Sequence, residues 1–132
     1  MRHRVVGHRL SRDKDEREAL RRNLIKQLFE HNRIQTTRAK AEAIRGQAER
    51  LITLAKRGNE AGKSEDKAVN AQMVHARRLA AARLSDPEAV KRLFDEIAPK
   101  YTDRPGGYVR MTRLGPRFGD AAEMVLLELV ED

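Results

Sequence analysis

Apolar residues recur at helical spacing in the first quarter of the chain. Over residues 13–31 they stand three to five positions apart, which predicts an amphipathic helix. Asp13 is placed to cap the start of this helix with Glu16 as its capping-box partner, and Asn32 to end it in left-handed backbone. The apolar face would consist of Leu20, Leu24, Ile25, Leu28 and Phe29.

A second helix is predicted after a short stretch that favours β structure. Residues 33–36 indicate one brief strand, and Thr36 or Thr37 can cap the helix that follows. Apolar positions keep helical spacing along this helix, and Gly58 is expected to end it. Residues 58–66 contain two glycines and almost no apolar side chain, which predicts a flexible loop.

Two more helical stretches follow the predicted loop. Residues 67–84 are rich in alanine and arginine, which favour helix. Another helix is expected to start at Asp86-Pro87, because proline is favoured in the first turn, and to stop at Pro99. Its apolar side chains, Val90, Leu93, Phe94 and Ile97, recur at helical spacing.

The periodicity changes to alternation near the C-terminal end. Residues 108–113 alternate, which predicts a strand with Val109 on one face and with Tyr108 and Arg110 exposed on the other. Residues 124–130 are leucine-rich and predict a more buried strand, paired with the first like a hairpin. The sequence therefore predicts an α+β fold, with about four helices packed on one face of a small sheet of about three strands.

Length and charge narrow the class of protein. The 132 residues suffice for one domain, 13–132, behind an extended basic arm, 1–12, in which Gly7 is a flexible point. A net charge of +8 with 36% charged residues favours a polyanionic partner, either nucleic acid or an anionic membrane. There is no cysteine for disulfide or thiolate chemistry, no run of about 20 apolar residues to span a membrane, and no secretory signal. We therefore expect a cytoplasmic protein.

The positive charge is concentrated in three segments. Residues 1–12 hold four bases and no acid, residues 33–57 seven bases and two acids, and residues 100–119 five bases and one acid. Residues 120–132 hold five acids and no base. Arginine outnumbers lysine 20 to 8, and the planar guanidinium binds phosphate oxygens in pairs, although a GC-rich genome explains the excess equally well, so the segregation of charge is the stronger evidence.

No motif for catalysis or cofactor binding is present. The four histidines do not stand at metal-ligand spacing, the glycines form no phosphate-binding loop, and no serine lies in a nucleophile elbow. We expect no catalytic residue, no metal and no cofactor. What remains is a binding protein.

Three places offer groups that suit a phosphate backbone. The arm's arginines repel one another unless a polyanion neutralises them, and the alternative interpretation is a disordered tail. Thr36-Thr37 at a helix start offers hydroxyls and free amides to an anion, although simple capping is an equal alternative. Gly106-Gly107 would let the backbone approach a phosphate, and Tyr108 could stack on a base beside Arg110, or instead cover the edge of the sheet.

Several motifs together resemble one family, the bacterial large-subunit ribosomal protein seventeen. They are Met1-Arg2-His3-Arg4 with Gly7, Leu10 and Arg12; Arg22-Asn23; Arg33-Ile34 with Thr36, Thr37, Lys40, Ala41, Ile44 and Arg45; Leu51 to Lys56; Arg104 to Arg110; Arg117 to Met124; and Glu128 to Val130. They run in the same order over residues 1–130, so the set is specific although no single motif is. The chain departs at Glu42, where the family leads us to expect a basic residue.

The resemblance implies a structural protein of the bacterial large ribosomal subunit, near the exit of the nascent-peptide tunnel. Its partners would be large-subunit ribosomal RNA and neighbouring ribosomal proteins, with no membrane span and no small-molecule substrate. The residues predicted to contact RNA are Arg2, His3, Arg4, His8, Arg9 and Arg12 in the arm; Arg22; Arg33, Thr36, Thr37, Arg38, Lys40 and Arg45 around the start of the second helix; and Gly106, Gly107, Tyr108, Arg110, Arg113 and Arg117.

Two other functions are weighed against this one. A free-standing DNA- or RNA-binding protein could place the second helix in a major groove, but no short turn joins it to the third helix as in a helix-turn-helix. A small enzyme acting on RNA would need a catalytic acid or histidine, and the sequence nominates none.

Overall fold

The computed structural model describes residue 3 and residues 7–131. Over these residues it contains helices and a sheet of three strands, as the sequence predicts. The elements are α1 (Lys14–His31), β1 (Arg33–Thr37), α2 (Arg38–Gly62), α3 (Lys67–Leu84), α4 (Pro87–Arg92), a π-helical turn (Leu93–Ile97), a 3₁₀ turn (Ala98–Tyr101), β2 (Val109–Pro116) and β3 (Glu123–Leu129).

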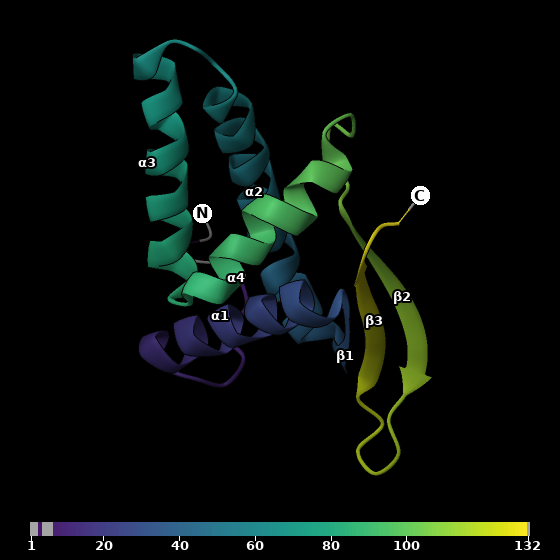
Figure 1. Cartoon of the computed structure of the whole chain (residues 1–132). Coiled ribbons are helices and arrows are strands. Elements are labelled where there is room, and N and C mark those ends of the chain that lie inside the picture. The colour runs from purple at the N-terminus through teal and green to yellow at the C-terminus, as the bar shows by residue number, and fades with distance from the viewer. Residues whose placement is uncertain (1–2, 4–6, 132) are drawn as a thin grey trace.

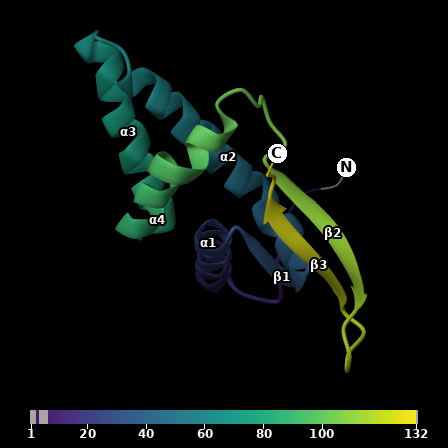
Figure 2. The ribbon, with the colours of Figure 1, turned by 45° about the vertical axis from the view of Figure 1, so that its right-hand side comes forward.

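The strands form one antiparallel sheet in the order β1-β3-β2. The helices gather on one side of this sheet, and β2 and β3 form a long hairpin whose loop extends past the helices (Figures 1 and 2). Arg33 of β1 and Arg110 of β2 are both in register with Glu128 of the central strand β3. The predicted architecture and the predicted pairing of the two C-terminal strands are confirmed.

The capping residues predicted at both ends of α1 are confirmed. The Asp13 side chain accepts a hydrogen bond of 2.9 Å from the Glu16 amide. Asn32 has a φ of 67°, and its amide donates to the Leu28 carbonyl at 2.8 Å, which closes the last turn. The apolar face buries Ile25, Leu28 and Phe29, while Leu20 and Leu24 lie at its half-buried margin.

Helix α2 is longer than the sequence predicts. Gly58 does not end it; the helix continues to Gly62, and residues 58–62 are helical rather than a loop. A Cβ at Gly58 would lie 2.8 Å from the Ala76 Cβ and 3.1 Å from the Phe94 ring. Gly58 therefore permits α2 and α3 to pack closely, so its role is in packing between helices and not in termination.

Three smaller expectations also need correction. Pro99 lies in the first turn of the 3₁₀ segment, so the helical path continues to Tyr101. Thr37 is the N-cap of α2, but its side chain makes no capping hydrogen bond. The described part of the arm is not uniformly extended, because Leu10 and Ser11 adopt positive φ values of 56° and 55° and turn the chain.

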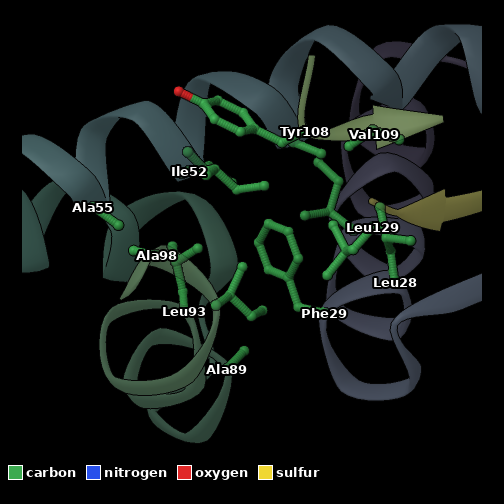
Figure 3. Close-up of a cluster of buried hydrophobic side chains, with 14 of the residues drawn as sticks. Leu28, Phe29, Ile52, Ala55, Ala89, Leu93, Ala98, Tyr108, Val109 and Leu129 are labelled. Atoms are coloured by element: carbon green, nitrogen blue, oxygen red, sulfur yellow. The ribbon is translucent and has the colours of Figure 1, made fainter. Parts of the chain in front are cut away.

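A continuous core joins the sheet to all the helices. Phe29 from α1, Ile52 from α2, Leu93 after α4 and Leu129 from β3 meet in its centre (Figure 3). Alanines at the close approaches, such as Ala55, leave room for these larger side chains. This apolar scaffold fixes the sheet and the start of α2 relative to each other, and the basic residues are arranged on it.

Candidate nucleic-acid interface

The start of α2 carries basic residues on a rigid junction between strand and helix. Thr36 is buried at 8% exposure, so it presents little of its surface to a ligand. The first turn of α2 contains no acidic residue, and Lys40 is half-buried there with no ion pair among the described residues. The positive end of the helix dipole and Lys40 therefore act together on this surface.

An ionic cluster of four side chains lies beside this junction. Arg38 donates from Nε to Glu42 Oε1 at 2.9 Å and from Nη1 to Glu123 Oε2 at 3.1 Å. Arg113 Nε lies 3.5 Å from Glu123 Oε1. The hydrogen bond from Arg38 is the main cause that lowers the pKa of Glu42, and the bonds to Glu42 and Glu123 raise the pKa of Arg38. Strand β3 thus supplies a carboxylate to two predicted RNA contacts.

On the outer face of the sheet, another predicted RNA contact is also paired with a carboxylate of β3. Arg110 donates from Nε and Nη2 to Glu128 Oε1, at 3.0 and 2.8 Å. Arg33, Arg110, Glu128 and Glu131 line one cavity of about 530 Å³ at this end of the sheet. The cavity therefore combines two guanidinium groups with two carboxylates. The Arg110 side chain is 59% exposed and the Glu128 side chain only 20%, so the arginine remains accessible from solvent while its carboxylate partner is largely covered.

Tyr108 lies in the core and not on the exposed face of the sheet (Figure 3). Strand β2 begins at Val109, so the alternation that would turn Tyr108 outward does not reach it. Its hydroxyl accepts a hydrogen bond from Lys56 Nζ at 2.9 Å, and its ring lies 5.2 Å from that of Tyr101. Burial favours a higher pKa for Tyr108, but hydrogen bonds from Lys56 and Thr53 outweigh it and lower the pKa. The predicted stacking of this ring on a base is therefore wrong, because its exposed fraction is only 1%.

The Gly106-Gly107 turn is held by an arginine of its own segment. Arg104 Nε donates to the carbonyls of Gly106 and Gly107 at 3.1 and 3.2 Å, and Lys56 Nζ donates to the Arg104 carbonyl. Gly107 has a φ of +65°, and a Cβ at either glycine would meet open space. Close approach of a phosphate to this turn is sterically free and stays a prediction.

The described part of the arm is anchored to α1 and displays its charges. Arg21 Nη2 donates to the His8 carbonyl at 3.0 Å, which pins the arm to the helix. Arg9 and Arg12 are exposed and have no carboxylate partner among residues 3 and 7–131. His3 is exposed as well, whereas Arg2 and Arg4 lie outside the described residues.

Arg22 occupies a basic cavity that sequence reasoning did not foresee. Its Nε donates to the Arg83 carbonyl at the end of α3, at 3.2 Å. Arg21, Arg22 and Arg83 line a cavity of about 330 Å³, and Arg21 Nε is buried there without a hydrogen-bond partner in the described structure. Arg83 stands 61 positions from Arg22, so no local pattern could have joined them.

The remaining predicted residues lie apart from these groups. Arg45 is on the outer side of α2, 3.6 Å from Glu49. Arg117 is in the hairpin loop, where Nε and Nη2 reach Asp120 at 3.0 and 2.6 Å. The structure therefore brings predicted contacts from distant segments together, because Arg38 and Arg113 share Glu123 and Arg33 and Arg110 line one cavity. Among the described residues there is no cluster of three side chains suited to a metal ion, and no helix is both long and apolar enough to cross a membrane.

The chain is similar to proteins of one family over almost its whole length. Residues 20–130 match the sequence profile of a family described as Ribosomal protein L17. A Clostridium perfringens (strain SM101 / Type A) protein, named Large ribosomal subunit protein bL17, is 46% identical over 127 residues, which are 96% of this chain and 100% of that protein.

Two further relatives carry the same name. The one from Syntrophotalea carbinolica is 45% identical over 132 residues, 100% of this chain and 76% of that protein. The one from Alkaliphilus metalliredigens is 49% identical over 124 residues, 94% of this chain and 97% of that protein.

Proposed function

Because the chain belongs to the ribosomal protein L17 family, we propose that it is a structural constituent of the bacterial large ribosomal subunit that binds large-subunit RNA. The observation that carries the proposal is the similarity to proteins of that name across 94–100% of the chain. From the family resemblance we also place it in the cytoplasm, near the exit of the nascent-peptide tunnel and beside other ribosomal proteins. The role is structural, and we assign no catalytic group.

The basic surfaces of the molecule support binding through phosphates. The arm, the start of α2 and the cavity beside Arg22 come from different parts of the chain, and the core holds the last two rigidly. A protein with several such surfaces can fasten RNA segments that are distant in the RNA sequence. Recognition by shape and phosphate position suits double-helical RNA, whose deep major groove is closed to side chains.

Ribosome binding separates this function from that of a free-standing nucleic-acid-binding protein. We expect the tagged chain to cosediment with large subunits after a high-salt wash, and mass spectrometry of the washed subunits to find it in about one copy. A chain that stays at the top of the gradient at moderate salt and binds any duplex DNA equally well would contradict the proposal.

A further inference from the structure

Phe118 is the one aromatic side chain that the fold leaves outside. The other four aromatic residues of the chain are buried, each at no more than 4% exposure. Phe118 has a relative exposure of 103%, so its ring contacts essentially nothing in the protein. It lies in the loop between β2 and β3, which extends away from the helices (Figures 1 and 2).

The loop keeps its shape without using the Phe118 ring. The Arg117 amide donates to the Ala122 carbonyl at 2.8 Å, and the Ala121 amide donates to the Arg117 carbonyl at 3.0 Å. Asp120 accepts from the Arg117 guanidinium and, at 3.1 Å, from the Ala122 amide. These bonds close the loop on both sides of Phe118. The ring is thus displayed on a rigid support, and ordering it for a partner requires little change in the backbone.

The surroundings of the ring favour a nucleobase as its partner. Arg117 precedes it directly, and the Arg113 side chain on β2, the strand that leads into the loop, is 69% exposed. Pro116, the last residue of β2, and the loop residues Gly119 and Asp120 lie within two positions of Phe118 in the chain. Leu114, at 48% exposure, and Pro116 are the exposed apolar residues that precede it on the hairpin, and a large ring flanked by arginines suits a base that stacks while its phosphate meets a guanidinium.

We propose that Phe118 stacks on an unpaired base of the large-subunit RNA, with the exposed Arg113 facing the adjoining phosphate while Arg117 stays bound to Asp120 and holds the loop. This inference rests on the proposed function, and it adds a position where the protein reads a single-stranded element and not a helix. Stacking tolerates any base, because each base offers an aromatic face.

The absence of tryptophan from the chain supplies a direct test. Phe118→Trp places a single reporter on the loop, and it is compared with Phe118→Leu and with Phe118→Ala. Leu114→Ala, which removes an exposed apolar side chain from the same hairpin, is the matched control. Circular dichroism verifies that each variant is folded, and binding is measured with protein-free large-subunit RNA.

We expect Phe118→Trp to keep the wild-type affinity and to show quenched tryptophan emission in the complex. Phe118→Leu and Phe118→Ala should bind roughly ten-fold more weakly, as removal of one stacked base predicts, and Leu114→Ala should be unchanged. Wild-type affinity for Phe118→Leu, or unaltered emission on RNA binding, overturns the inference. Emission that changes only in assembled subunits identifies a protein neighbour and also overturns it. If the wild-type chain does not bind the RNA, the proposed function itself fails.

Discussion

The N-terminal arm and the C-terminal hairpin carry similar positive excesses in the sequence but differ in the folded protein. Residues 1–12 contain four bases and no acid, and residues 100–119 five bases and one acid. The chain then returns as β3, and residues 120–132 add five acids and no base. The hairpin and its flanks, residues 100–132, therefore hold five bases and six acids. Charge counted along the chain thus overstates the attraction of this region for RNA.

The same difference is visible in individual contacts. Arg110, Arg113 and Arg117 each meet a carboxylate of β3 or of the hairpin loop. Arg9 and Arg12 meet none among the described residues. A phosphate that binds the hairpin must displace a carboxylate, whereas one that binds the arm adds a first partner. We expect the arm to contribute more to affinity than the hairpin.

Removal of residues 1–12 should give the largest effect. The slope of log K against log salt changes by about 0.7–0.9 for each phosphate that the protein neutralises, so deleting four arginines should flatten it by roughly three. We expect a fall in affinity of about 100-fold or more at low salt, measured by filter binding to large-subunit RNA over a salt series. Replacing the four arginines by lysine should preserve most of the slope. A truncated protein with the wild-type slope would show that the arm does not bind phosphates.

A paired and an unpaired cation can be compared with matched variants. Lys40→Ala should weaken RNA binding several-fold and lower the salt slope by about one, because Lys40 has no ion pair in the described structure. The double variant Arg110→Ala with Glu128→Gln removes two side chains whose charges cancel each other. Its RNA affinity should stay within about two-fold of that of the wild type.

Glu128→Gln alone should change the RNA affinity in the opposite direction to Lys40→Ala. It frees Arg110 and should strengthen binding a few-fold, more than Glu60→Gln at a distant site does. If the double variant loses as much affinity as Lys40→Ala, Arg110 binds a phosphate despite its carboxylate, and the distinction between the two regions breaks down.

Tyr108→Phe tests whether the Tyr108 hydroxyl serves the fold or contacts the RNA. The change removes a hydroxyl that accepts a hydrogen bond from Lys56 but keeps the buried ring. We expect the free energy of unfolding to fall by about 1 kcal/mol in urea titrations, and RNA affinity to be unchanged. A clear loss of affinity without loss of stability would place the hydroxyl at the RNA.

The smallest effect concerns the pH dependence of the hairpin loop. Hydrogen bonds from the Arg117 guanidinium and then from the Ala122 amide lower the pKa of Asp120 from 3.8 to about 2. Because the pKa is lower in the folded state, this clamp stabilises the loop fully above about pH 4 and is lost as the pH falls through about 2. The Ala122 amide shift in NMR should titrate in this range, and Asp120→Asn should abolish the transition. A midpoint near 3.8 in the wild-type protein would mean that the clamp does not form in solution.

Much of the fold could be predicted because its signals are local. The Asp13 cap, the left-handed Asn32 and the spacing of Leu28 and Phe29 act within one or two helical turns. Gly58 has the residue type of a helix terminator, and only the approach of Ala76 from α3 shows that it serves packing. The alternating pattern also predicts the wrong side for Tyr108. Side chains alternate between the two faces only inside a strand, and Tyr108 lies one position before β2.

The sequence by itself determined the family resemblance, the α+β class, most helix boundaries and the sign of the charge. Local spacing already allows the pairs of Arg45 with Glu49 and of Arg117 with Asp120, but only the tertiary structure decided the long-range partners: Arg38 meets Glu123 across 85 positions, and Arg110 meets Glu128 across 18. Cap and periodicity signals depend on neighbours a few residues away, but the partner of a guanidinium depends on strand register and helix packing. The sequence therefore determines which residues are charged, but the fold determines the net charge of each surface.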